Sequence, residues 1–373
     1  MKSSCFLHKA LWIFLVGCTC LTANKKGYAQ VEHQYAVIGY YMGNGADAGK
    51  YQVEKLTHII YSFLHLEGNL LIDKPQDSVN ITELVALKKR NPDLKVILSL
   101  GGWGGCPSCP DVFASEKGRT DFAISVKNLL IKYKADGLDL DWEYPAISSI
   151  PGYKYGPEDR PNFTSLLIKL REILGKDYEI SFAAGGFKEF LDKSVEWDKV
   201  INYLDYINLM TYDIVNGYSK TTGHHTSLYS TQQQPTSTDY VVKYLDSIGV
   251  PPGKLIIGAA FYSRVFKDVE AGNNGLYQSG KFSDYVNFFG MDQYFEKNPG
   301  FVHFWDPQAM APYCYNEKTK LFATLDNERS IGLKAAYVKE KNLGGIMFWS
   351  LGGDRFEYGL LDIIDSELNK PVR

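Results

Sequence analysis

The sequence predicts an α/β fold, a TIM-type (β/α)8 barrel with a small α+β insertion between its seventh and eighth strands. From residue 35 onward, short runs rich in β-branched and aromatic residues alternate with amphipathic stretches, as expected of βα units around a parallel sheet. The runs number eight, which is the count that closes a barrel. About 80 residues separate the last two runs, far more than an ordinary βα connection needs.

The predicted elements follow one another at the spacing of βα units. The strands are assigned to 35–41, 56–66, 94–100, 136–142, 178–184, 205–212, 254–261 and 344–351. Between strands, apolar residues recur at helical spacing from Phe163 to Leu174, and Gly175 ends that stripe at a C-cap-like position. Further helices are predicted at 122–133 and at about 81–90, 238–248 and 330–341.

The long connection after the seventh strand is expected to form an inserted domain. Its residues, 265–330, are rich in aromatics, so an ordered α+β domain is expected rather than an unstructured loop. In a barrel enzyme, this insertion lies on the face that holds the active site. The barrel itself is assigned to residues 31–264 and 331–373.

The first thirty residues are predicted to be a targeting segment rather than part of the fold. Two lysines lie before an apolar stretch at 10–16, and Ala29 ends a small-x-Ala cleavage site. We therefore expect a signal peptide over 1–29 and export, into the periplasm or out of the cell. The alternative is a lipoprotein signal ending at residue 17, with Cys18 lipidated on the outer membrane. The apolar stretch is too short to span a membrane, which takes about 20 residues.

Composition and charge argue against a nucleic-acid-binding role. The 373 residues are 45% apolar and carry a formal charge of −3, which describes a globular protein with a large core. A nucleic-acid-binding protein carries a basic patch, whereas the lysines and arginines of this chain are scattered. A monomer with a small neutral or weakly charged substrate is expected.

Cysteines and histidines give no metal-binding pattern. Cys106 and Cys109 form a CPSC pair, but no second pair or histidine cluster completes a zinc site, so a disulfide or two free thiols are expected there. His224 and His225 point apart in an extended loop, and the sequence shows no acidic partner for them. We expect neither a metal nor another cofactor.

The fourth predicted strand carries four acids within eight positions. The stretch "ADGLDLDWEYP" contains Asp136, Asp139, Asp141 and Glu143, separated by apolar residues. Because side chains alternate across a strand, the last three acids share one face and the apolar residues between them share the other. In a barrel the acidic face points inward, and Glu143 lies at the C-terminal mouth.

Crowding predicts that Glu143 is a general acid. Neighbouring carboxyl groups cannot all ionise freely, so a shared proton raises one pKa and lets Glu143 donate near neutral pH. Acids on a single strand cannot flank a scissile bond as the paired carboxyls of an ordinary glycosidase do. In a glycosidase, an N-acetyl group of the sugar would then have to attack, with Asp141 holding it. A calcium site is disfavoured because leucines and a tryptophan separate the acids.

These motifs resemble glycoside hydrolase family 18, the TIM-barrel chitinases with the motif DxxDxDxE, which begins here at Asp136 and precedes Tyr144. Substrate assistance is documented for this family. Its other motifs appear in order as "SLGGW" (99–103), "INLMTYD" (207–213), "FYSR" (261–264) and "GGIMFWSLGGD" (344–354). The resemblance also implies a chitinase insertion domain, with Trp305 in its groove wall.

The resemblance implies a role for each matching residue. Glu143 would protonate the glycosidic oxygen and later activate water, and Asp141, assisted by Asp139, would orient the acetamido group. Tyr212 would donate a hydrogen bond to the acetamido carbonyl. The residues implied to bind substrate are Tyr40, Phe63, Ser99, Trp103, Met210, Asp213, Tyr262, Arg264 and Trp349. For Phe63 and Met210 the alternative is a place in the barrel core.

The predicted function is an exported chitinase that hydrolyses β-1,4 bonds between N-acetylglucosamine residues with retention. Its partners would be chitin or chitooligosaccharides. One alternative is an endo-β-N-acetylglucosaminidase acting on N-glycans, and the other is a chitinase-like lectin, which the presence of Glu143 disfavours. The choice between endo and exo action is left open by the sequence, because it depends on loop geometry.

Overall fold

The computed structural model describes residue 1 and residues 35–371. The predicted signal peptide, its cleavage site and Cys18 lie outside the described residues. Within 35–371, no helix combines the length and the apolar character that a bilayer crossing requires.

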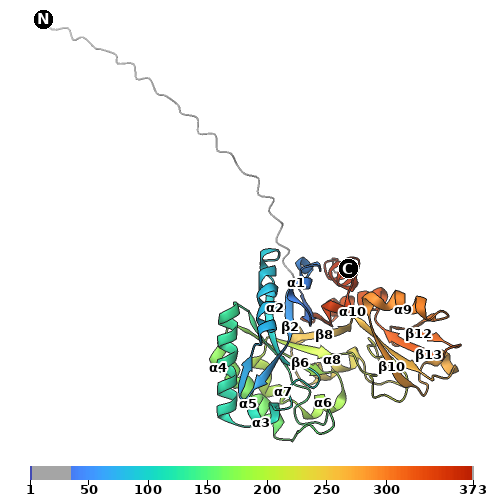
Figure 1. Cartoon of the computed structure of the whole chain (residues 1–373), viewed down its shortest axis with the longest axis horizontal. Coiled ribbons are helices and arrows are strands. Elements are labelled where there is room, and N and C mark those ends of the chain that lie inside the picture. Colours follow the sequence, from blue (N-terminus) through green and yellow to red (C-terminus); the bar gives the residue numbers. More distant parts are fainter. Residues whose placement is uncertain (2–34, 372–373) are drawn as a thin grey trace. The chain divides into compact units, whose positions relative to one another are not determined.

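Eight parallel strands close into a barrel, which confirms the predicted fold (Figure 1). The sheet order is β1-β14-β8-β7-β6-β5-β4-β2, and pairing of β1 with β2 completes the ring. The strands are β1 (Ala36–Tyr41), β2 (His58–Glu67), β4 (Lys95–Gly101), β5 (Gly137–Asp141), β6 (Glu179–Gly185), β7 (Tyr206–Met210), β8 (Leu255–Ala260) and β14 (Gly345–Trp349). A short strand, β3 (Leu70–Ile72), forms a hairpin with β2.

Helices surround the barrel and cover its apolar outer face. The longer ones are α2 (Pro75–Ala86), α4 (Glu116–Tyr133), α5 (Asp159–Leu174), α8 (Thr238–Ser247), α10 (Glu328–Glu340) and α11 (Leu360–Leu368). The shorter ones are α1 (Gly45–Ala48), α3 (Cys109–Phe113), α6 (Lys188–Lys193), α7 (Trp197–Val200) and α9 (Met291–Lys297). Helix α2 begins earlier than predicted, because Pro75 occupies its first turn and Asp77 accepts a hydrogen bond from the Lys74 amide at 2.8 Å.

Alternation along β5 separates the two sides of the barrel wall as predicted. Leu138 and Leu140 are buried against the helix layer, and the following Trp142 lies against Phe113 and Phe163. The barrel interior holds a separate small cluster of buried residues. Its members are Ala36, Ile38, Tyr40, Ile60, Ile97, Ile256 and Met347.

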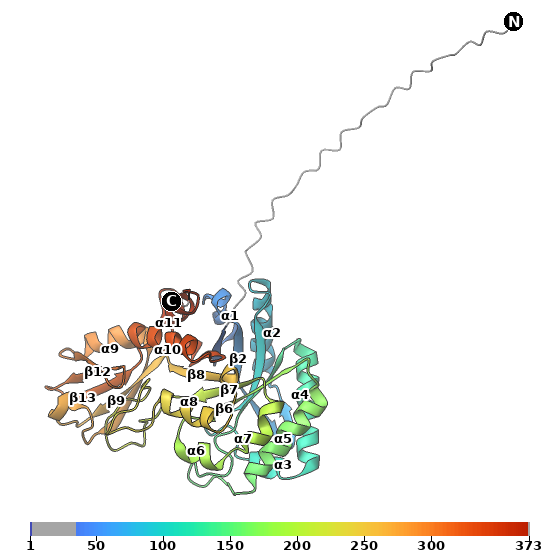
Figure 2. The same ribbon diagram turned by 180° about the vertical axis from the view of Figure 1, so that it is seen from behind.

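A second, five-stranded antiparallel sheet lies between β8 and β14 in the chain. Its order is β10-β9-β13-β12-β11, with α9 beside it, and both views place it at one side of the barrel (Figures 1 and 2). The strands are β9 (Tyr262–Lys267), β10 (Lys281–Asn287), β11 (Val302–Asp306), β12 (Ala311–Asn316) and β13 (Leu321–Leu325). The division into a barrel and an insertion at 265–330 stays a prediction.

A buried ion pair joins the end of the second sheet to α10. Lys334 Nζ lies 2.6 Å from an Asp326 carboxylate oxygen, and both side chains are almost completely buried. Lys334→Met should lower the free energy of unfolding by about 3–5 kcal/mol, because it leaves a buried carboxylate without its cation. Urea denaturation measures this change.

A matched control is Lys193→Met, which breaks the exposed pair with Glu189 on α6. That substitution should cost about 0–1 kcal/mol, as expected of a surface ion pair. Equal effects of the two substitutions would show that burial of the Lys334 pair contributes nothing to stability.

Candidate active site

A cavity of about 1750 Å³ opens at the C-terminal ends of the barrel strands, where TIM-barrel enzymes keep their active sites. The second sheet supplies part of its wall through β9 and β10. The predicted site residues that line it are Tyr40, Phe63, Trp103, Asp141, Glu143, Met210, Tyr212, Asp213, Tyr262, Arg264 and Trp349. Residues from six barrel strands and their loops thus meet at one place.

Asp139 lies beneath this cavity, inside the barrel, and is fully buried. Four side chains donate hydrogen bonds to its carboxylate: Tyr40 at 3.1 Å, Ser99 at 2.8 Å, Ser181 at 2.7 Å and Asn208 at 3.1 Å. Burial nevertheless raises the pKa of Asp139. Ser99, which is also fully buried, can therefore contact Asp139 but not a ligand in the cavity.

Asp141 forms the middle of the acid row. Its pKa is well above the ordinary value, first because the group is buried and then because Glu143 and Asp139 repel its charge. Its Oδ1 atom is buried and has no hydrogen-bond partner among the described residues. The side chain lines the cavity, so a donor group on a ligand can satisfy that oxygen.

Glu143 ends the row at the cavity mouth. Burial raises its pKa to about 7, a hydrogen bond from Tyr144 lowers the pKa, and the charge of Asp213 raises it. The carboxyl group therefore keeps its proton at mildly acidic pH and can donate it. Burial also raises the pKa of Tyr212, so that its hydroxyl stays a hydrogen-bond donor at neutral pH.

Trp349 is half-buried at the end of β14 and lies among aromatic rings. Phe63 stacks with it at a centroid distance of 5.6 Å and an angle of 13°, and the Tyr40 ring lies 6.0 Å away. Both Phe63 and Met210 are half-buried and line the cavity, so they are more than barrel-filling residues. The arrangement offers a flat apolar surface of the kind that packs against sugar rings.

The far wall of the cavity holds an ion pair. Arg264 binds Asp213 with two hydrogen bonds, from Nε at 2.8 Å and from Nη2 at 2.5 Å. Burial raises the pKa of Asp213, but the nearby His225 and the two hydrogen bonds from Arg264 outweigh this effect, and the pKa lies well below its ordinary value. Asp213 is therefore ionised throughout the neutral range.

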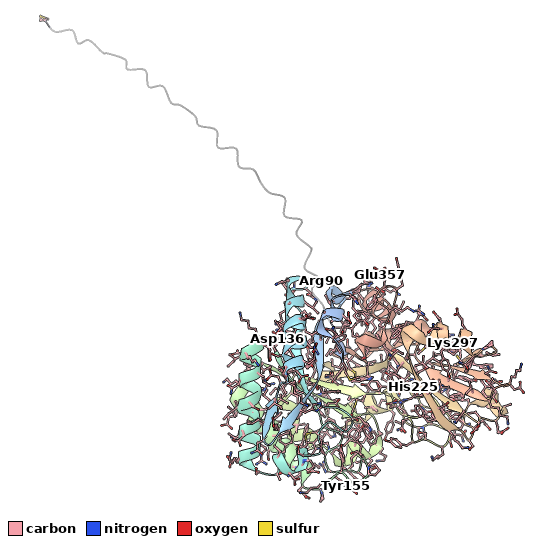
Figure 3. All side chains as sticks on the ribbon, viewed as in Figure 1. Arg90, Asp136, Tyr155, His225, Lys297 and Glu357 are labelled. Carbon is pink, nitrogen blue, oxygen red and sulfur yellow. A yellow bond between two sulfur atoms is a disulfide. The ribbon has the colours of Figure 1, made fainter. Side chains whose placement is uncertain are left out.

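The two adjacent histidines do have acidic partners, which the sequence did not reveal. His224 Nε2 lies 2.9 Å from Asp306, and His225 Nδ1 lies 3.7 Å from Asp213. His225 is buried where the barrel meets the second sheet (Figure 3), and its amide donates to Thr324 on β13 at 3.0 Å. Within residues 35–371, no group of three or more potential ligands could hold a metal ion.

Some predicted residues lie away from the cavity. Asp136 sits at the base of β5, where it accepts a hydrogen bond from the Val96 amide at 2.6 Å and pairs with Lys88 at 2.6 Å. Trp305, expected in a groove wall, is not among the cavity-lining residues, and the guanidinium of Arg329 stacks on its ring at 3.7 Å. It lies on the edge strand β11, remote in the sheet order from β9 and β10.

Other residues that line the cavity were not predicted from the sequence. Phe282 and Tyr285 reach the cavity from β10, and Phe187 reaches it from the segment after β6. No local pattern marks Phe282 and Tyr285, because the pairing of β10 with β9, with its bulge between Phe282 and Asp284, decides which β10 side chains face the cavity. The CPSC pair forms a disulfide between Cys106, in the loop that follows the cavity residue Trp103, and Cys109, the first residue of α3.

Comparison with known families and proteins gives matches over most of the chain. The model described as "Glycosyl hydrolases family 18" matches residues 36–354. Chitinase A1 of Niallia circulans is 31% identical over 88% of this chain, and Chitinase B of Serratia marcescens is 30% identical over 85%. The chain spans 58% of the length of the first relative and 77% of the second.

A solved structure shows the same architecture. The structure described as a glycoside hydrolase family 18 N-acetylglucosaminidase from Paenibacillus barengoltzii is 36% identical in sequence, with a TM-score of 0.80. The match covers 89% of this chain and 99% of that chain. The family match over residues 36–354 spans the barrel strands, the second sheet and the residues that line the cavity.

Proposed function

Because this chain belongs to glycosyl hydrolase family 18 and is a glycoside hydrolase, we propose that it is an exported chitinase. It cleaves β-1,4 bonds between N-acetylglucosamine residues with retention, and Glu143 is its general acid and base. The observation that carries this proposal is the buried acid row of β5, which ends in Glu143 with a pKa raised to about 7 at the cavity mouth. Export depends on the N-terminal signal predicted from the sequence.

The distribution of carboxyl groups supports attack by the substrate's own amide. Besides Asp141 and Glu143, the described lining residues include two carboxylates, Asp213 and Asp77. Arg264 binds both oxygens of Asp213, and Asp77 accepts a tyrosine hydroxyl at 2.6 Å. Neither is a free nucleophile opposite Glu143, so the acetamido oxygen of the sugar fills that role.

In the first step, Glu143 donates its proton to the glycosidic oxygen as the bond to C1 breaks. The acetamido carbonyl oxygen forms a bond to C1 and gives an oxazolinium ion. Asp141 accepts a hydrogen bond from the acetamido N–H and balances the positive charge, and Tyr212 donates a hydrogen bond to the acetamido oxygen. The ionised Glu143 then takes a proton from water, whose oxygen attacks C1 as the bond between C1 and the acetamido oxygen breaks, and the original configuration is restored.

A substrate comparison tests this function. Chitotetraose should be hydrolysed with the β-anomer as first product by NMR, whereas the fully deacetylated tetramer should resist cleavage because it has no acetamido group. A high-mannose glycoprotein, the substrate of the alternative enzyme, should stay intact. Equal rates on the acetylated and deacetylated tetramers would refute substrate assistance.

The likeness to an N-acetylglucosaminidase raises a second candidate, the release of single N-acetylglucosamine units from a chain end. Product analysis with end-labelled chitooligosaccharides separates the two. A chitinase should release chitobiose and longer products first, and an N-acetylglucosaminidase should release the monomer throughout the reaction.

The basic limb of the pH profile should depend on Asp213. In the wild type, kcat/KM should fall as pH rises through about 7, because Glu143 then loses its proton. Asp213→Asn removes the negative charge that raises the pKa of Glu143 and leaves Arg264 without its anion. Both changes lower the pKa of Glu143, so the basic limb should move to lower pH.

A matched control is Asp292→Asn on α9, which breaks an exposed pair with Arg355 at 2.6 Å. It removes one negative charge from an ion pair with arginine, as Asp213→Asn does, but this pair lies outside the described cavity lining. The pH profile of kcat/KM should therefore not move. A basic limb unchanged in Asp213→Asn, or shifted equally in both variants, would contradict the electrostatic role of Asp213.

A further inference from the structure

Tyr285 brings the second sheet into contact with the catalytic cavity. It lies on β10 directly opposite Arg264 of β9, and it lines the cavity with 38% of its surface exposed. Its ring stacks on that of Tyr262, with a centroid distance of 4.7 Å and an interplanar angle of 21°. A stacked ring on a paired strand has little freedom to turn away from the cavity.

Three aromatic rings surround the guanidinium of Arg264. Its central carbon lies 5.3 Å from the centroid of Tyr262, 5.5 Å from Phe282 and 5.5 Å from Tyr285. Rings at this distance attract the cation through their π faces and exclude water from it. Arg264 donates two hydrogen bonds to Asp213. The three rings, called the aromatic cage below, therefore also restrain the Asp213 carboxylate, whose charge raises the pKa of Glu143.

Tyr285 has a second contact, with Trp349, which we call the floor of the cavity. Its hydroxyl lies beside the indole of Trp349, which acts on the pKa of Tyr285 after burial has raised it. The indole N–H can only donate, so the tyrosine oxygen is the acceptor. This contact brings the second sheet to the end of β14 at one edge of the indole, while Phe63 stacks on its face.

We propose that Tyr285 is a positioning residue with two separable roles in the hydrolysis proposed above: its hydroxyl orients the Trp349 floor for sugar binding, and its ring holds the Arg264–Asp213 pair for the chemical step. The second sheet thereby supplies more than a wall of the cleft. Through Tyr285, it also positions Trp349, against which a sugar ring would pack, and Asp213, whose charge acts on the general acid Glu143.

Two substitutions separate the roles. Tyr285→Phe keeps the ring and removes the hydroxyl, so KM for chitotetraose should rise about fivefold, the effect of one ordinary hydrogen bond, with kcat unchanged. Phe282→Leu removes one face of the cage without touching Trp349, so kcat should fall about tenfold with KM unchanged, as expected when a positioned charge pair loosens. Tyr285→Leu should show both effects.

Controls tie these changes to the proposed contacts. Tyr244→Phe removes a hydroxyl that binds Asp192 on the surface, at 2.8 Å, and should change neither constant. Binding of chitotetraose to Glu143→Gln and to the Glu143→Gln, Tyr285→Phe double variant, followed by tryptophan fluorescence, should show the same fivefold loss in Kd. Melting temperatures identify any variant that does not fold.

The outcomes are distinct from those that test the function itself. If Tyr285→Phe has the wild-type KM, the hydroxyl of Tyr285 does not orient Trp349 for sugar binding. If a folded Phe282→Leu has the wild-type kcat, the aromatic rings do not hold the Arg264–Asp213 pair for the chemical step. Should Tyr285→Leu fail to fold, the other two variants still decide. If Glu143→Gln retains turnover, the proposed function fails, whatever the Tyr285 variants show.

Discussion

Glu143→Gln should lower kcat for chitotetraose by about 10²–10⁴-fold, the usual contribution of a general acid and base. Glutamine has nearly the same shape, but it can neither give a proton to the leaving oxygen nor accept one from water. Steady-state kinetics with a reducing-end assay measures the loss, and calorimetry checks that chitotetraose still binds.

Asp136→Asn is the matched control for this substitution. Asp136 belongs to the same acidic stretch but lies at the base of β5, paired with Lys88. Turnover should stay near the wild-type value, with at most a small loss of stability from a half-exposed ion pair. A Glu143→Gln protein as active as Asp136→Asn would exclude Glu143 as the proton donor.

Asp141→Asn should lower kcat by about 10²–10³-fold, the usual effect of removing a preorganised group that stabilises transition-state charge. Asparagine fits the same buried space, so folding should be preserved. It has no charge to balance an oxazolinium ion, and only one of its two terminal atoms can accept a hydrogen bond from the sugar N–H. Pre-steady-state kinetics with an activated-leaving-group substrate reports the first chemical step directly.

A substrate without the acetamido group gives the control for Asp141. Any residual hydrolysis of the deacetylated tetramer should be equally slow in the wild type and in Asp141→Asn, because Asp141 acts on the missing group. If Asp141→Asn slowed both substrates by the same factor, Asp141 would act through the fold or through Glu143 rather than through the acetamido group.

The barrel was predictable because its pattern is local and repeated. Eight runs rich in β-branched and aromatic residues, which alternate with amphipathic stretches, identify the strands, and the structure confirms all eight. The two-residue period of β5 likewise predicted that Asp139 and Asp141 face inward. The start of α2 was less predictable, since the cap at Lys74 and the proline at 75 outweighed the apolar periodicity further along.

Site residues far apart in the sequence were predicted only through the resemblance to a family. Tyr212, Arg264 and Trp349 belong to such motifs and line the cavity. Trp305 was expected in the groove wall by the same resemblance, but it lies on β11, at the opposite edge of the second sheet from β10. Sheet order, which sequence motifs do not encode, decides that outcome.

The sequence by itself determined the number of barrel strands and the face on which the acid row lies, because both follow from backbone periodicity within a few residues. Only the tertiary structure decided that Tyr285 and Phe282 surround Arg264, and that Asp213 lies close enough to raise the pKa of Glu143. These effects depend on burial and on distances between distant segments. Electrostatic and packing energies vary steeply with such distances, whereas the order of residues along the chain leaves them unspecified.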